Sequence, residues 1–183
     1  LKDLEAEAKK DPENFTWTSV GGSSTLDYAV RQFLKAIGVD VQKTKPIMTQ
    51  GASQALVLTA AGNVKMGSGS ISSSLTAIRA GTVRPLAVTS RTRFPDLPEV
   101  PTTAELGYPT VNAQDRYGPS GPPKLPPYIV DIWNKAMEEM VKDPEAISKM
   151  RNIGLIPLYL NSHVTREYVV QATEVVKELW GLR

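Results

Sequence analysis

Short apolar segments alternate with amphipathic helical segments along this chain, and this alternation is the strongest constraint on its fold. The clearest helix runs from Leu26 to Ile37, where apolar residues recur every three or four positions and Gly38 follows as a stop. Strand-like segments are predicted at 15–19, 39–47, 64–66 and 85–88. Strands that alternate with helices predict an α/β fold with mainly parallel sheets and flanking helices.

The second half of the chain is predicted to be mostly helical. Long helices are expected from Tyr128 to Lys142 and from Ser162 or Thr165 to Trp180, with a shorter one up to Arg151 between them. Strand-like segments are expected at 110–113 and 153–160. Trp133 and Trp180 fall on apolar helix faces and are expected in the core. Trp17, in the strand directly before a Gly/Ser turn, is expected in the core or in contact with a ligand.

Composition excludes several classes of function. The 183 residues carry a net charge of only +2, and the basic residues form no stripe, which argues against a nucleic-acid partner. There is no cysteine, no phosphate-binding or dinucleotide-binding glycine motif and no His/Asp/Glu spacing typical of a metal site. No apolar run approaches the ~20 residues that span a bilayer. We therefore expect no cofactor, no metal, no nucleic acid and no membrane insertion.

Three loops of small polar residues are the candidate binding elements. Each follows a predicted strand and precedes a helix, where unpaired backbone N–H groups and the helix dipole favour an anion such as a carboxylate. Such loops meet at the carboxyl edge of a parallel sheet. The candidate ligand-binding residues are Ser19, Gly22, Ser23, Ser24 and Thr25 in the first loop, Thr49, Gln50 and Gly51 in the second, and Ser68, Gly69 and Ser70 in the third. Each loop alone is equally compatible with an ordinary capped turn.

The segment from Ile78 to Pro109, IRAGTVRPLAVTSRTRFPDLPEVPTTAELGYP, carries the most specific sequence pattern. Gly81 suits a helix end, the prolines exclude a helix through the loop, and Thr102 or Thr103 can cap a short helix that Gly107 stops. The segment resembles the solute-binding proteins of tripartite tricarboxylate transporters, the TctC or Bug family. The matching positions are Arg84, Leu86, Ala87, Val88, Thr89, Ser90, Arg93, Leu97, Pro98, Val100, Pro101, Thr102, Glu105, Gly107 and Pro109.

The resemblance implies a periplasmic-binding-protein fold of type II, in which two α/β lobes close on a small carboxylate. Residues 1–113 would form the second lobe, and residues 114–183 the returning part of a first lobe that is incomplete here. Ser23, Ser24 and Thr25 would hold one ligand carboxylate. The family is non-enzymatic and periplasmic, so the implied partners are a di- or tricarboxylate, or a related organic acid, and the membrane permease subunits of the transporter.

Two other classes of function remain open at this point. The chain is also compatible with a ligand-sensing effector domain of the same type II fold, which would need a DNA-binding segment elsewhere in the protein. A serine-dependent enzyme would use a hydroxyl at 23–24 or 68–74, but His163 is the only histidine and is expected on the surface at a helix start.

Overall fold

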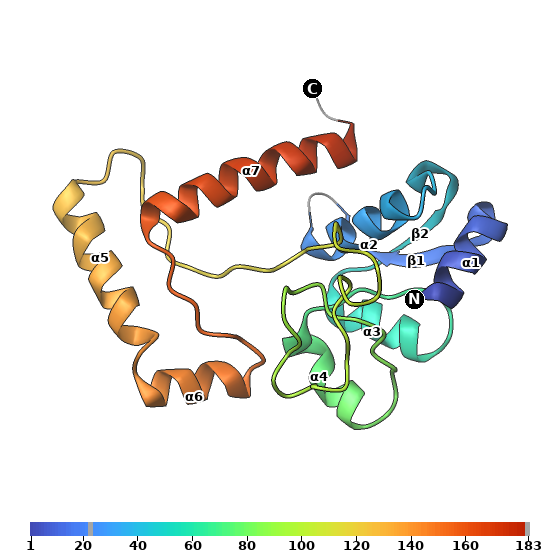
Figure 1. Ribbon diagram of the computed structural model, residues 1–183, viewed down its shortest axis with the longest axis horizontal. Coiled ribbons are helices and arrows are strands. Elements are labelled where there is room, and N and C mark those ends of the chain that lie inside the picture. Colours follow the sequence, from blue (N-terminus) through green and yellow to red (C-terminus); the bar gives the residue numbers. More distant parts are fainter. Residues whose placement is uncertain (22–23, 182–183) are drawn as a thin grey trace. The chain divides into compact units, whose positions relative to one another are not determined.

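The computed structural model describes residues 1–21 and 24–181, which fall into two compact units, Leu1–Asp115 and Arg116–Arg183 (Figure 1). The first unit contains the sheet. Strand β1 (Thr16–Ser19) pairs in parallel with β2 (Lys45–Met48), so that Thr16 lies opposite Lys45 and Ser19 opposite Met48. Trp17 also forms a parallel bridge with Met66, which places a third parallel segment beside β1.

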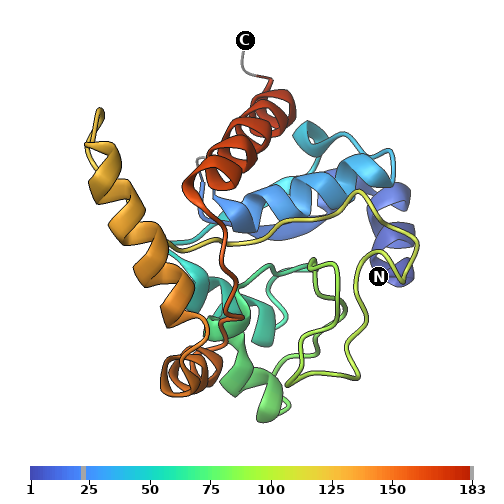
Figure 2. The same ribbon diagram turned by 60° about the vertical axis from the view of Figure 1, so that its left-hand side comes forward.

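Helices α1 (Lys2–Lys10), α2 (Thr25–Ala36), α3 (Ala52–Ala60) and α4 (Ile71–Arg79) surround these strands. Short 3₁₀ turns lie at Pro12–Asn14 and Val41–Lys43. Figure 1 shows α2 beside the strands, with α3 and α4 below them, and Figure 2 shows the same arrangement turned by 60°. The predicted α/β fold with parallel pairing is confirmed, with a smaller sheet than the sequence suggested.

Trp17 and Phe33 organise the main core. Trp17 is fully buried, as predicted, and its indole N–H donates to Thr44 Oγ1 at 2.8 Å. The Phe33 ring meets Tyr108 edge to face at 5.4 Å between centroids. The Tyr108 hydroxyl donates to Glu5 Oε2 at 2.6 Å, and this bond raises the pKa of Tyr108 to about 12. Helices α1 and α2 and the segment around Tyr108 are thus joined in one core.

A second core cluster lies under the segment from Pro85 to Gly107. It is built from Leu75 of α4 and from Val88, Phe94, Leu97 and Val100. The only pairing described within this segment is a parallel bridge between Val88 and Thr102. The strand predicted at 85–88 is therefore reduced to a single bridge at Val88, whose amide donates to the Pro101 carbonyl and whose carbonyl accepts from the Thr103 amide.

Other predicted strands are also shorter or missing. The segment at 39–47 turns first through Val41–Lys43, where Asp40 accepts from the Gln42 amide at 3.0 Å, and becomes strand only from Lys45. The segment at 64–66 contributes one bridge. Residues 110–113 and 153–160 form no strand. Val111 is buried without strand pairing, and Gly154 adopts φ +76°, which interrupts an extended segment.

The short helix predicted after Thr102 is wrong, because only a turn forms there. The start of this turn nevertheless carries the capping pattern of a helix start. The Thr102 amide donates to Glu105 Oε2 at 2.7 Å, and the Glu105 amide donates to Thr102 Oγ1 at 3.1 Å. Gly107, with φ +93°, ends the segment before a second turn can form.

The second unit contains α5 (Pro127–Met140), α6 (Pro144–Asn152) and α7 (Ser162–Trp180). Asp143 and Asn161 cap α6 and α7. No residue described in these three helices is buried. Trp133 is 51% exposed, so the prediction that it lies in the core is wrong, and Trp180 is only half-buried. Helical periodicity locates an apolar stripe, but only tertiary contacts decide whether the stripe is covered.

Gly67 is predicted to be sensitive to the smallest side chain. A Cβ at Gly67 would lie 2.1 Å from Thr59 Oγ1 and 3.0 Å from Thr59 Cβ, and Thr59 Oγ1 is held by a 2.8 Å bond to the Ala55 carbonyl. Gly67→Ala should lower the free energy of unfolding by about 1–3 kcal/mol, measured by urea denaturation. Gly118→Ala is the matched control, because a Cβ there meets nothing within 4 Å. Equal stability of the two variants would contradict this close approach.

Glu105 is predicted to make stability depend on acidic pH. Hydrogen bonds from Arg93 and from the Thr102 amide lower the pKa of Glu105 to about 2 from the usual 4.5. A lowered folded-state pKa contributes stability that is complete above about 4.5 and is lost as the pH falls towards 2. Glu105→Gln should therefore flatten the decline of the melting temperature across this window. Glu99→Gln, in the same exposed loop, should leave the slope as in the wild type; equal slopes for all three proteins would refute the assignment.

Candidate functional site

Three loops leave the sheet at one edge. The first connects β1 to α2, the second connects β2 to α3, and the third connects the Met66 bridge to α4. Because β1, β2 and the Met66 segment run parallel and side by side, their carboxyl ends lie at the same edge and three helices begin there. The sequence prediction that these loops share one edge agrees with this topology.

The end of β1 joins the other two loops through direct hydrogen bonds. The Ser19 carbonyl accepts from the Thr49 amide at 2.7 Å and from Thr49 Oγ1 at 3.0 Å. Thr18 Oγ1 accepts from the Ser68 amide at 3.3 Å. Thr18, Ser19 and Thr49 are all buried. These three residues fix the second and third loops against the first.

Asp27, in the first turn of α2, bonds back to the strand end of the first loop. It is 1% exposed, and its carboxyl group accepts from Ser19 Oγ at 2.5 Å and from the Val20 amide at 2.9 Å. Ser19 Oγ in turn accepts from the Gly21 amide at 3.1 Å. Gly21 has φ +75°, and a Cβ there would lie 2.9 Å from Met48 Cε. The loop therefore approaches the end of β2 closely.

Two of the three helices begin with a serine cap, and the third begins with a glycine. Ser24 Oγ accepts from the Leu26 amide at 3.2 Å in α2, and Ser70 Oγ accepts from the Ser73 amide at 3.3 Å in α4. In α3 the cap position is Gly51, which has no side chain to offer. Helix starts carry partial positive charge from the aligned peptide dipoles. Three such starts at one sheet edge make the edge suited to an anion.

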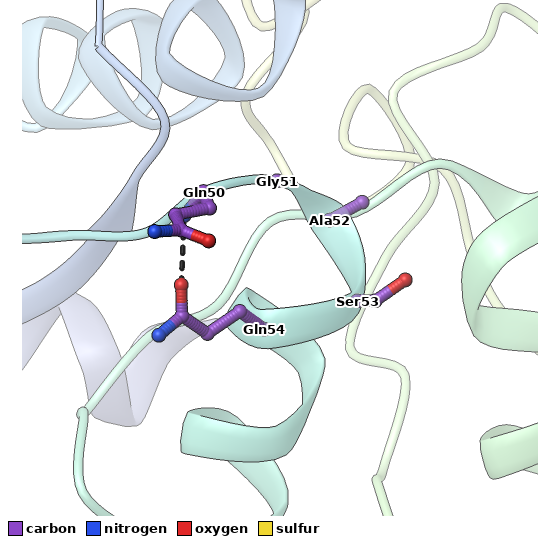
Figure 3. A pocket seen from close by; sticks show the side chains of 5 residues that line it. All are labelled: Gln50, Gly51, Ala52, Ser53 and Gln54. Carbon is purple, nitrogen blue, oxygen red and sulfur yellow. Dashed lines mark hydrogen bonds between the residues drawn. The ribbon is translucent and has the colours of Figure 1, made fainter.

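An open pocket of about 310 Å³ lies at the start of α3 and is lined by Gln50, Gly51, Ala52, Ser53 and Gln54 (Figure 3). Gln54 Oε1 accepts from the Gln50 amide at 2.7 Å across it. The Gln50 amide thus donates to a side-chain oxygen, and a carboxylate oxygen could accept the same hydrogen bond. The pocket presents amides and a hydroxyl and no ionisable side chain.

The structure separates the predicted site residues into groups. Ser19 and Thr49 are buried, with their hydroxyls bonded inside the protein as described above. Ser24, Thr25, Gly51, Ser68 and Ser70 are half-buried, and Gln50 and Gly69 are exposed. Gly22 and Ser23 lie outside the described residues.

Asp27 and Gln54 are contributors that the sequence reasoning did not select as site residues. Both stand three residues after the cap of their helix, at the position from which a side chain reaches back to the preceding backbone. Asp27 follows Ser24 and Gln54 follows Gly51 at this spacing. The spacing of three residues after a helix cap was the signal in the sequence that could have identified both residues.

Other chemistry finds little support in the part of the chain that the structure describes. No group of three or more His, Asp or Glu residues is placed there to hold a metal ion, and no described helix is long and apolar enough to cross a membrane. His163 is 79% exposed and lies 3.6 Å from Glu167 on its own helix. The Ser70 and Ser73 hydroxyls form a hydrogen bond with each other at 2.9 Å, and no contact of either with His163 is described.

Residues 1–180 match the family model described as the tripartite tricarboxylate transporter family receptor, TctC. A UPF0065 protein from the tcbD-tcbE intergenic region of Pseudomonas sp. strain P51 is 28% identical over 149 residues, covering 81% of this chain and 44% of that protein. Another, from the clcB-clcD intergenic region of Pseudomonas knackmussii, is 30% identical over 135 residues, covering 73% of this chain and 78% of that protein.

Among solved structures, R. palustris Rpa4515 with adipate superimposes with a TM-score of 0.82 at 25% identity. The match covers 99% of this chain and 60% of that one. The chain thus spans less than two thirds of this solved protein and less than half of the first Pseudomonas relative. With the family model matched along nearly its whole length, this chain belongs to the TctC family of tripartite tricarboxylate transporter receptors.

Proposed function

We propose that this chain captures a small carboxylate at the edge formed by its three loops, as part of the solute-binding protein of a tripartite tricarboxylate transporter. The observation that carries the proposal is the convergence of three helix starts on the carboxyl ends of parallel segments. Backbone amides and hydroxyls, rather than charged side chains, would hold the carboxylate. The adipate bound by a 25%-identical relative supports a dicarboxylate as the ligand.

The first loop would provide one side of the carboxylate site and the second and third loops the other. Ser23, Ser24 and Thr25 are proposed to receive the carboxylate, with Gln50, Gly51, Ser68, Gly69 and Ser70 completing the site. The two buried hydroxyl residues of the candidate set, Ser19 and Thr49, would act by holding the loops, because their polar atoms already bond to protein groups. The ligand would thus form its hydrogen bonds mostly with exposed and half-buried groups.

The unit Leu1–Asp115 would be the second lobe of a two-lobed binding protein, and Arg116–Arg183 would belong to the first lobe. The lobes would close on the ligand because only the closed form contacts it from both sides. Delivery to membrane permease subunits and a periplasmic location are part of the proposal, and the receptor family that the chain matches supports both. In this account the protein binds and hands over its ligand without chemical conversion.

The proposal is tested by calorimetric titration of the 183-residue chain with adipate, succinate and malate. We expect heat from at least one of them and none from adipamide, which has the length of adipate without its charge. Binding that is the same for adipate and adipamide would show that anion capture at helix starts is not the mechanism. Absence of heat with every acid, at concentrations that detect micromolar affinity, would contradict the proposed function for this chain.

A charge placed in the α3 pocket should weaken binding of these acids. Gln54→Glu would set a carboxylate beside the Gln50 amide, where Gln54 Oε1 now lies at 2.7 Å. Like charges within a few ångströms repel by ~1 kcal/mol even in water, so affinity should fall about fivefold or more. Gln42→Glu, on the exposed 3₁₀ turn, is the matched control and should leave affinity unchanged. Equal affinities would place the ligand away from this pocket.

A further inference from the structure

We infer that Asp27 is the positioning residue of the binding edge: it would hold the first loop in its receptive form without touching the ligand. The inference rests on the proposed function for its link to ligand affinity, but its structural part can be measured separately. Its basis is the set of contacts that joins Asp27 to Ser19, Val20 and Gly21.

Asp27 bridges the two ends of the first loop. Its backbone belongs to the first turn of α2, while both of its described hydrogen bonds reach back to the strand side, at Ser19 and Val20. One side chain therefore links the strand end of the loop, at Ser19 and Val20, to the first turn of α2. The ordinary cap of the helix is supplied separately by Ser24, whose hydroxyl accepts from the Leu26 amide. Capping alone thus does not account for Asp27.

The same side chain influences a second loop through Ser19. Ser19 Oγ donates to Asp27, while the Ser19 carbonyl accepts both the amide and the hydroxyl of Thr49. Only a shift of the Ser19 backbone after loss of Asp27 would reach the second loop, because Thr49 bonds to the Ser19 carbonyl and not to its side chain. A change at one buried carboxyl group would then alter two of the three loops.

The burial of Asp27 makes its two hydrogen bonds costly to lose. Asp27 is 1% exposed, and burying a carboxyl group costs free energy that its hydrogen bonds offset. An apolar residue of similar volume would leave the Ser19 hydroxyl and the Val20 amide without this acceptor, and each such loss destabilises the loop. What only the carboxyl group supplies is two acceptor atoms at defined positions for Ser19 Oγ and the Val20 amide.

The Asp27 contacts also predict where a ligand would not bind. The Val20 and Gly21 amides donate within the protein, to Asp27 and to Ser19 Oγ. The donors that meet the ligand should therefore lie further along the chain, nearer the start of α2. The ligand would then meet the helix start, where the dipole is strongest.

The test compares Asp27→Leu, which keeps the volume and removes both acceptors, with Asp27→Asn, which keeps one acceptor oxygen for the Val20 amide. Asp40→Asn is the control, because Asp40 also accepts a backbone amide but caps an exposed 3₁₀ turn. The affinity of the 183-residue chain for adipate should fall about tenfold or more in Asp27→Leu, the size of loss seen when hydrogen bonds that orient metal-binding residues are removed. Asp27→Asn should recover part of it, and Asp40→Asn should match the wild type.

Amide hydrogen exchange gives a second reading that needs no ligand. Exchange at Val20 and Gly21 should quicken in Asp27→Leu, while amides in α1 and the core of α2 stay as in the wild type. A folded Asp27→Leu with unchanged exchange at these two amides, or with wild-type adipate affinity, would overturn the inference. If the wild type binds none of the acids, the proposed function fails, and the exchange rates alone still decide whether Asp27 holds the loop.

Discussion

The carbonyl and side chain of Ser19 hold together the part of the molecule on which the rest depends. The residue ends β1, accepts twice from Thr49, donates to Asp27 and accepts from Gly21. Next to it, Thr18 receives the Ser68 amide. Three loops that are far apart in sequence are thus fixed by two adjacent buried residues, and the helix starts that follow them are brought to one edge. Neighbouring strands alone would align the loops only roughly; these hydrogen bonds set their positions.

This arrangement explains why small residues dominate the loops. Gly21 lies close to Met48, and Gly67 lies close to Thr59, so a side chain at either position would push the loop outwards. The hydroxyl residues divide between two tasks, because Ser19 and Thr49 bond inwards while Ser24 and Ser70 cap helices. The proposed carboxylate-binding edge would therefore be built from backbone geometry without a cationic side chain, in keeping with helix-start anion sites.

Much of the fold could be predicted from the sequence, and the failures have physical causes. Helices such as α2 and α7 follow from apolar spacing and caps, which are local properties. The strand expected at 85–88 is only one bridge, because pairing depends on a partner segment and the described partner, at Pro101–Thr103, meets Val88 alone. The burial expected for Trp133 failed because burial depends on which surface covers a helix, and sequence periodicity carries no information about the partner surface.

The candidate site shows the same division between local and non-local information. The loops and helix starts were found from glycine, serine and threonine in sequence, and the parallel pairing that brings them together agrees with the fold class. Asp27 and Gln54 were not selected, because their roles depend on backbone atoms that only the folded loops place within reach. The spacing of three residues after each cap was visible, but it is equally common in helices without a ligand.

The central claim is that the three loops act as one carboxylate-binding edge. Two-dimensional NMR of the backbone amides during titration with adipate tests it most directly. The account predicts that amides in all three loops, including Thr25, Gln50 and Ser70, shift together along one binding curve. Shifts confined to a single loop, or found only on the helices of the second unit, would contradict it.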